Sequence, residues 1–275
     1  MLKGSSVHHV SRLTFYASLL IALAACAESP RTTPTPATIT LAASSTLSAP
    51  LDDLAHQYRG KYPWITIEAE SLDSEAALDR LEDGAVGLAF VSWLPSDVDP
   101  GAWISPLAYD AVAVIVHPSN PVTGLSLVEL RDIFQGRVLD WSVFGWTNEN
   151  VNVVSREDGS GTRAAFEALT MEGRSITPGA IVQPDGDAVV DTVAHTRGAI
   201  GYVSRGRATP AVKPIAIEGV DPVASNVVNN SYPIGRLLYV VARSEPAGAA
   251  RDFVAWLFSP EGQQAIADKG FGRVK

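Results

Sequence analysis

Short apolar runs alternate along this chain with segments that have one apolar helical face, and this alternation restricts the fold more than any other feature. Residues 86–91 and 111–116 are continuous apolar runs of strand length, as expected for strands covered on both faces. Residues 51–58 place apolar side chains at i, i+3, i+4 and i+7, which is one face of a helix. Repeated strand–helix units of this kind predict an α/β fold with mostly parallel sheets. A length of 275 residues accommodates one large or two modest domains.

Two helix starts are visible in the sequence. Residues 126–129 read Ser-Leu-Val-Glu, a capping box in which the serine hydroxyl and the glutamate carboxylate each accept a backbone N–H. At residues 259–260 a serine precedes a proline, which suits an N-cap followed by the first helical position. Both patterns predict where a helix begins.

The amino terminus has the plan of a secretory signal peptide. Lys3 and Arg12 precede an apolar run from residue 15 to residue 25. This run is shorter than the roughly 20 residues that a spanning helix needs. It ends in Leu-Ala-Ala-Cys, which is similar to the bacterial lipobox, in which the cysteine is acylated and becomes the new N-terminus. We expect residues 1–26 to be a lipoprotein signal peptide ending at a lipidated Cys26; the alternative is an ordinary signal peptide with an accidental cysteine.

Residues 27–37 follow as a segment rich in proline and threonine without apolar periodicity, which predicts an extended tether. Loss of the two basic residues of the signal peptide would change the net charge from −9 to −11. Such an acidic protein is a poor candidate for binding nucleic acid. The single cysteine excludes an internal disulfide and a cysteine-based zinc site, and His56, His117 and His195 lack metal-ligand spacing. We therefore expect no metal, no cofactor and no nucleic-acid partner.

The stretch with the most chemical information is residues 155–163, Ser-Arg-Glu-Asp-Gly-Ser-Gly-Thr-Arg, between a predicted strand and a predicted helix. A helix N-terminus offers unpaired amides and the positive end of a dipole. The hydroxyls of Ser160 and Thr162 and the planar fork of Arg156 add donors suited to an oxyanion, and Asp158 would hold that fork in place. A plain helix cap with a tight turn would have the same composition.

A second hydroxyl loop, Ser45-Thr46, also follows a predicted strand and precedes a predicted helix. Open α/β sheets bind ligands beyond the carboxyl ends of their strands, where both loops would lie. The pair of loops favours an oxyanion site over a plain cap.

With these motifs the chain resembles the periplasmic phosphate-binding proteins that serve phosphate ABC transporters, over most of residues 38–275. The segment 156–162 is the most specific element of the likeness, and the others are mostly scaffold. They lie at residues 44–50, 110–116, 133–136, 198–203 and 259–263. The resemblance implies an α/β, two-lobe periplasmic-binding-protein fold (type II), with mostly parallel sheets joined by two crossover strands. We expect residues 38–110 plus 236–275 to form one lobe and residues 111–235 the other.

The resemblance also places residues from both lobes around one dehydrated oxyanion. Arg156 would pair with the anion, and Asp158 would orient the arginine. The remaining donors would be the hydroxyl or amide groups of Thr46, Leu47, Ser71, Ser160, Gly161 and Thr162.

The chain departs from the family where the family has an aspartate at the start of the third strand, which accepts the proton of hydrogen phosphate and repels sulfate. The alignment puts Gly87 there, and Trp93 stands where an arginine is common. Loss of that acceptor would cost discrimination on the order of 1.5–3 kcal/mol. Asp73 and Glu70 are the candidates to replace it.

We therefore expect an extracytoplasmic phosphate-binding lipoprotein, a monomer that is held at the membrane by a lipid on Cys26 and delivers inorganic phosphate to ABC permease subunits. One alternative is a binder or sensor of another tetrahedral oxyanion such as sulfate, molybdate or tungstate. The alternative from another class is a secreted hydrolase with Ser160 as nucleophile. A Gly-x-Ser-x-Gly context is missing around Ser160, so we expect no enzyme.

Overall fold

The computed structural model describes residues 35–274. The expected signal peptide, Cys26 and most of the expected tether lie outside these residues. All elements below belong to one compact unit, Pro36–Lys275. Within the described residues, every helix is too short or too polar to cross a membrane.

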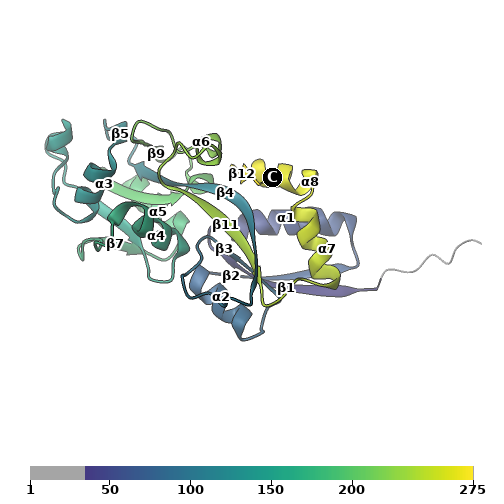
Figure 1. Cartoon of the computed structure of the whole chain (residues 1–275). Coiled ribbons are helices and arrows are strands. Elements are labelled where there is room, and N and C mark those ends of the chain that lie inside the picture. The colour runs from purple at the N-terminus through teal and green to yellow at the C-terminus, as the bar shows by residue number, and fades with distance from the viewer. Residues whose placement is uncertain (1–34, 275) are drawn as a thin grey trace, which may run out of the picture. The chain divides into compact units, whose positions relative to one another are not determined.

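The first lobe is built on three parallel strands, with helices on both faces (Figure 1). The strands are β1 (Ala37–Ser44), β2 (Ile65–Leu72) and β3 (Leu88–Val91). The helices are α1 (Ser48–Lys61), α2 (Ser74–Glu82), α7 (Gly248–Leu257) and α8 (Pro260–Ala267). Successive side chains of a strand point to opposite faces. Leu41 of β1 therefore packs in the core under α1, α7 and α8, whereas Ala42 packs with α2.

The second lobe repeats this plan. Its parallel strands are β6 (Asn152–Arg156), β7 (Ile181–Gln183) and β8 (Ala199–Ser204). Val189 and Val193 of α5 (Gly186–His195) cover one face of the sheet. On the other face, α3 (Leu127–Phe134) and α4 (Gly161–Phe166) contribute Phe134 and Phe166 to a second core. Helix α4 continues into the π-helical turn η2 (Glu167–Met171). The remaining described elements are short: β5 (Gly124–Leu125), η1 (Trp141–Phe144), η3 (Arg205–Arg207), β9 (Lys213–Pro214), β10 (Ala216–Ile217), α6 (Ala224–Val228) and β12 (Gly272–Arg273).

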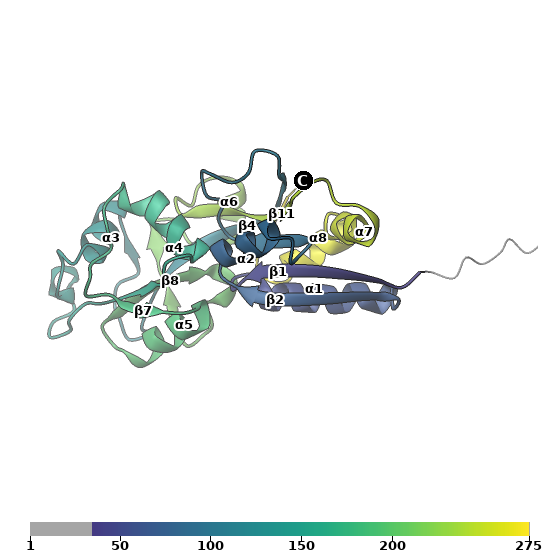
Figure 2. The ribbon, with the colours of Figure 1, turned by 90° about the horizontal axis from the view of Figure 1, so that it is seen from below.

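Two crossover strands connect the lobes, and both views show them running side by side between the two groups of helices (Figures 1 and 2). They are β4 (Trp103–Val116) and β11 (Gly235–Ala242), which pair antiparallel. The main strand order is β2-β1-β3-β11-β4-β8-β6-β7. Parallel pairing in this order holds within each lobe, whereas the crossover strands pair antiparallel with all their neighbours.

The lobe boundaries at residues 110/111 and 235/236 remain our proposal. The distribution of apolar side chains supports them: Ala108 and Leu238 belong to the core of the first lobe, and Ala111 and Ile234 belong to that of the second. A hinge at this point would leave both cores intact.

Both helix starts that the sequence predicts are confirmed. Ser126 accepts the Glu129 N–H while the Glu129 carboxylate accepts the Ser126 N–H, which is a complete capping box at the start of α3. Ser259 accepts the Gly262 N–H and Pro260 is the first residue of α8.

Candidate functional site

The carboxyl ends of β1 and β6 bring the two hydroxyl loops together. Thr46 follows β1 in the first lobe, and Thr162 lies in the first turn of α4 in the second lobe. Their Oγ1 atoms are 3.2 Å apart, and both side chains are buried. Residues 116 positions apart in the sequence therefore meet directly across the lobes.

A small cavity of about 10 Å³ lies at this junction. Thr46, Arg156 and Thr162 line it together with Ser45 of the same hydroxyl loop and with residues that the sequence reasoning missed, namely Gly186, Tyr202, Val203, Ser204 and Arg207. None of these described lining residues is acidic. Because the cavity has the size of about one water molecule, an oxyanion requires the lobes to move apart before they close around it.

Arg156, the one cation of the predicted set, is buried, with 2% of its surface exposed. Its Nε donates to the Gln183 carbonyl at 3.1 Å and its Nη2 to the Pro184 carbonyl at 2.7 Å. The carboxylate that pairs with it, Glu157, is 3.5 Å away and partly exposed. Carbonyl oxygens thus hold the guanidinium in place without neutralising it, which leaves its charge for an anion.

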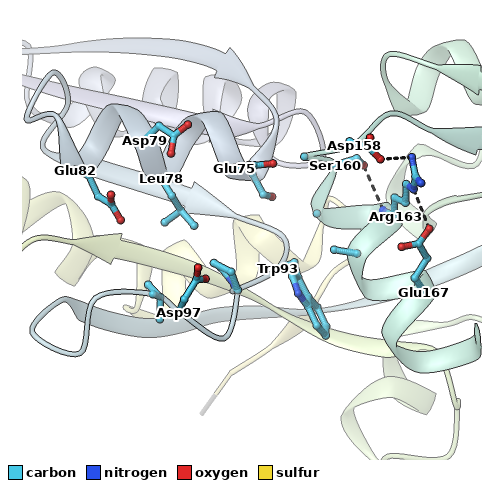
Figure 3. A pocket seen from close by; sticks show the side chains of 16 residues that line it. Glu75, Leu78, Asp79, Glu82, Trp93, Asp97, Asp158, Ser160, Arg163 and Glu167 are labelled. Carbon is cyan, nitrogen blue, oxygen red and sulfur yellow. Dashed lines mark hydrogen bonds and ion pairs between the residues drawn. The ribbon is translucent and has the colours of Figure 1, made fainter. Parts of the chain in front are cut away.

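Asp158 does not orient Arg156, contrary to the sequence expectation. Its carboxylate is 94% exposed and pairs with Arg163 Nη1 at 2.6 Å. Gly159 has a φ of +81°, so the backbone turns sharply after Asp158 and directs the side chain toward α4. Figure 3 shows Arg163 held between Asp158 and Glu167.

The hydroxyl of Ser160 caps α4, because it accepts the Arg163 N–H at 3.3 Å. The alternative of a plain cap therefore describes this side chain. Gly161 is different: a Cβ at this position would lie 2.6 Å from Ser92 Oγ and 2.9 Å from Ser74 Cβ. Only glycine allows the loop to approach these two serines of the first lobe so closely.

The serine that the first lobe presents to the loop is Ser74, not Ser71. Strand β2 continues to Leu72, so Ser71 is still in the strand and its side chain is exposed. Ser74 is the first residue of α2 and is buried; its Oγ accepts the Ser92 N–H at 3.1 Å and lies 3.2 Å from Ser92 Oγ. The sequence does contain a signal for this helix start: Asp73 is a typical N-cap residue, and its carboxylate caps α2, which makes Ser74 the first helical residue.

The Leu47 amide is engaged in a turn, where it donates to the Ser44 carbonyl at 2.7 Å. It would have to leave that carbonyl before it donated to an anion. Tyr202, by contrast, is a donor at the cavity that the sequence reasoning missed. Burial raises the pKa of Tyr202 to about 12, so its phenol stays protonated; its oxygen lies 2.8 Å from Ser155 Oγ.

A buried ion pair between the crossover strands supports the two threonines. Arg236 of β11 donates to Asp110 Oδ2 of β4 from Nε at 3.0 Å and from Nη2 at 2.7 Å. Its Nη1 also donates to Thr162 Oγ1 at 3.2 Å, and its Nη2 to Thr46 Oγ1 at 3.4 Å. Burial raises the pKa of the Asp110 carboxyl, and the charge and hydrogen bonds of Arg236 and a hydrogen bond from Ser204 oppose that rise. Both threonine hydroxyl oxygens accept an N–H from Arg236. The hydroxyl hydrogens therefore point away from Arg236, so that each hydroxyl can donate to the other threonine or to a ligand.

Gly87 lies far from this site. It precedes β3, and its amide donates to the carbonyl and to the hydroxyl of Thr40. The loops meet at the other end of the strand, about 13 Å away at the usual rise per residue. An acceptor from this strand would have to occupy its carboxyl end, where Ser92 and Trp93 stand.

The two candidates to replace the family's aspartate are placed differently. Glu70 is partly exposed and makes a bidentate ion pair with Arg80, at 2.7 and 2.9 Å. Asp73 lies against the loop: its Oδ2 is 3.0 Å from the position that a Cβ of Gly159 would occupy. Of the two, only Asp73 is beside the predicted anion loop.

A much larger cavity of about 560 Å³ opens between α2, the segment 93–98 and α4 (Figure 3). Arg163 is the only basic residue among its described lining residues, whereas six carboxylates line it: Glu75, Asp79, Glu82, Asp97, Asp158 and Glu167. Its negative charge opposes an anion. Of the two cavities, the small one therefore suits an anion better, despite the difference in volume.

Comparisons with known proteins show the family of this chain. Residues 29–261 match the family described as the PBP superfamily domain. The phosphate-binding protein PstS of Bacillus subtilis is 28% identical over 239 residues, which cover 85% of this chain and 79% of that protein. PstS of Pseudomonas aeruginosa is 28% identical over 259 residues, which cover 83% and 80%.

Solved structures extend the likeness to three dimensions. A protein from Clostridium perfringens with bound phosphate has a TM-score of 0.83 at 28% identity and covers 87% of this chain and 100% of its own. An ABC-type phosphate transport receptor from Vibrio cholerae has a TM-score of 0.74 at 27% identity and covers 86% and 100%. The chain therefore belongs to the PBP superfamily, as a divergent relative of the phosphate-binding proteins with the two-lobe type II fold.

Proposed function

We propose that this protein binds inorganic phosphate between its lobes and delivers it to the permease subunits of an ABC importer. The observation that carries the proposal is the meeting of Thr46, Arg156 and Thr162 around a cavity whose described lining holds no acid. The relatives named above are phosphate-binding proteins, and a likeness at 28% identity over most of both chains supports the same ligand class here.

The proposed mechanism is binding without chemistry. Arg156 supplies the main charge, and the hydroxyls of Thr46 and Thr162 donate to the anion. Ser74, Ser160 and Gly161 line the larger cavity in this structure; we propose that the Ser74 hydroxyl and the amides at Ser160 and Gly161 donate once the lobes have closed around the anion. Lobe closure removes water, which strengthens these interactions, and forms the surface that the permease recognises.

Two observations support a binding protein over the hydrolase alternative. The Ser160 hydroxyl already accepts the Arg163 N–H. His195, the histidine that a serine nucleophile would need, is exposed and pairs with Asp191 at the end of α5. Among the described residues, the Ser160 hydroxyl has no hydrogen bond with a histidine, so it lacks the paired base that activates a serine nucleophile.

Sulfate is the second candidate ligand, because the described residues that line the cavity include no carboxylate to repel an anion without a proton. Asp73 lies near the loop but outside that lining. Weak discrimination between phosphate and sulfate would follow.

Calorimetry on the full-length protein in detergent tests the ligand. Phosphate, arsenate, sulfate, molybdate and tungstate are titrated in turn across the pH range in which hydrogen phosphate titrates. We expect stoichiometric phosphate binding without turnover of a phosphate ester. Arg156→Ala should weaken it by about two orders of magnitude or more, since a charged hydrogen-bond donor contributes about 1.5–3 kcal/mol for each bond. Unchanged affinity in this variant would refute the site.

We also propose that the protein is extracytoplasmic, a monomer, and anchored by a lipid on Cys26. The basic, apolar and Leu-Ala-Ala-Cys segments in sequence support this location. Intact-mass spectrometry of the membrane fraction should show loss of residues 1–25 and addition of acyl chains; an unmodified cysteine would contradict the anchor.

A further inference from the structure

Arg207 is a cation at the cavity to which neither the sequence nor the family resemblance gives a role. It ends the turn η3 after β8 in the second lobe, and its side chain is 18% exposed. It lines the small cavity together with Arg156, and it also lines a neighbouring cavity of about 200 Å³ that contains Lys269 of the first lobe. Arg207 therefore lines both cavities, and the neighbouring one is also lined by Asp53, so its described lining carries both signs of charge.

The guanidinium of Arg207 contacts both lobes. Its Nη1 donates to Asp187 Oδ2 of α5 at 2.7 Å, within the second lobe. Its Nη2 donates to the carbonyl of Ser45, in the hydroxyl loop of the first lobe. The contact with Ser45 exists only while the lobes are together, whereas the contact with Asp187 does not depend on closure.

The turn that carries Arg207 packs tightly against the first lobe. A Cβ on Gly206 would lie 2.9 Å from the carbonyl oxygen of Lys269. Glycine thus allows η3 to touch the segment between α8 and β12, and this contact fixes where the arginine can reach.

The charges around Arg207 favour an anion in the cavity. Asp187 is largely exposed, so water screens its pairing with the arginine. Lys269 is already paired with Asp53. Two guanidinium groups, those of Arg156 and Arg207, line a cavity whose described lining has no carboxylate, and an arginine has five N–H donors, more than Asp187 and Ser45 use.

We propose that Arg207 is a second cationic ligand of the bound oxyanion and the clasp that holds the two lobes closed over it. The inference rests on the proposed function, because it concerns the same anion. In the open form Arg207 stays with Asp187; on closure it adds the Ser45 carbonyl and donates a further N–H to the anion. One side chain, Arg207, then supplies both the charge that binds the ligand and the contact that holds the lobes closed.

The test compares three variants of the full-length protein in detergent by phosphate calorimetry and stopped-flow dissociation. Arg207→Gln should weaken phosphate binding about 10- to 100-fold, mainly through faster dissociation, because it loses a charged donor and the clasp together. Arg207→Lys keeps the charge without the fork and should fall between wild type and Arg207→Gln. Arg205→Gln is the matched control, since Arg205 lies on the same turn and its side chain bonds only the Ala208 carbonyl among the described residues.

The outcomes separate the two proposals. If the wild type binds phosphate and Arg207→Gln binds it within twofold of wild type, the role of Arg207 is refuted while the proposed function stands. If Arg205→Gln loses as much affinity as Arg207→Gln, the effect belongs to the turn and the inference fails. If the wild type binds no tetrahedral oxyanion, both proposals are overturned. Urea unfolding of each variant shows whether the fold is retained, and rescue of Arg207→Ala by added guanidinium ion would confirm a ligand role that a merely structural defect could not reproduce.

Discussion

Replacing Arg236 by methionine removes one partner of the ion pair that connects the crossover strands. Both side chains of the pair are at most 1% exposed, and the two bonds to Asp110 are 2.7 and 3.0 Å long. Water therefore contributes little screening, and the variant leaves a carboxylate buried without its counter-charge. Breaking such a pair costs about 3–5 kcal/mol, a large part of the roughly 5–15 kcal/mol that stabilises a domain.

Protonation of Asp110 sets an upper limit on the part of this cost that comes from the unpaired charge. Asp110 can escape its unpaired charge by protonation, and each pKa unit costs about 1.4 kcal/mol. At pH 7 protonation of a carboxyl with an unfolded pKa of about 3.9 costs about 4 kcal/mol, so the charge contributes no more than that to the destabilisation. Near pH 4 protonation costs almost nothing, and only the lost hydrogen bonds and packing remain.

The sign of the pH dependence follows from the direction of the shift. Burial raises the pKa of Asp110, and in the variant the charge of Arg236 no longer opposes that rise. A carboxyl whose folded pKa lies above its unfolded pKa stabilises the fold below the unfolded value, and this stabilisation is lost as the pH rises. The destabilisation of Arg236→Met relative to wild type should therefore grow from about pH 4 to pH 7, by at most about 1.4 kcal/mol per pH unit.

Urea unfolding of wild type, Arg236→Met and the double variant Asp110→Leu/Arg236→Met at both pH values measures these differences. We expect the double variant to be more stable than the single variant at pH 7, because it leaves no buried charge. Arg251→Met is the control, since Arg251 is exposed and pairs only with the neighbouring Asp252 among the described residues. A cost below about 1 kcal/mol at pH 7, or one that does not change with pH, would refute the reasoning.

Two further predictions concern the contact between the first lobe and the anion loop. Gly161→Ala should cost about 1–3 kcal/mol of stability and prevent full closure of the lobes, because its Cβ would lie 2.6 Å from Ser92 Oγ. Gly60→Ala is the control, since Gly60 has open space around it. Equal phosphate affinity in the two variants would contradict the contact. Ser74→Ala should lower the free energy of unfolding by about 1–3 kcal/mol and weaken phosphate binding, since the buried Ser92 N–H loses its acceptor. Ser71→Ala should change neither measurement, and the opposite ranking would restore Ser71 to the site.

Local features were predictable because they depend on residues close together in the chain. Residues 155–163 gave the strand–loop–helix arrangement, since the apolar run before them and the hydroxyl at Ser160 are adjacent signals. The capping box at Ser126 is complete for the same reason. Apolar periodicity and helix capping involve residues within one or two helical turns, so the spacing of residues along the chain is enough to predict them.

The ends of strands and the directions of individual side chains could not be predicted as well from the sequence. The resemblance points to Ser71 because the alignment places this residue in the loop after the second strand, whereas the strand continues to Leu72. Strand ends are uncertain from sequence by a few residues. The partner of Asp158 depends on the left-handed turn at Gly159. The position of Gly87 depends on which end of β3 faces the loops, which an alignment does not show.

The sequence by itself determined that this chain is an α/β protein with a donor-rich, glycine-containing loop at a helix start. The tertiary structure decided which residues meet at the proposed anion site. Arg236 lies 126 residues from Asp110 and 190 from Thr46, and Arg207 lies 162 residues from Ser45. These pairs exist because the crossover strands bring two separate lobes together, and contacts made over such sequence separations leave no periodic pattern in the chain.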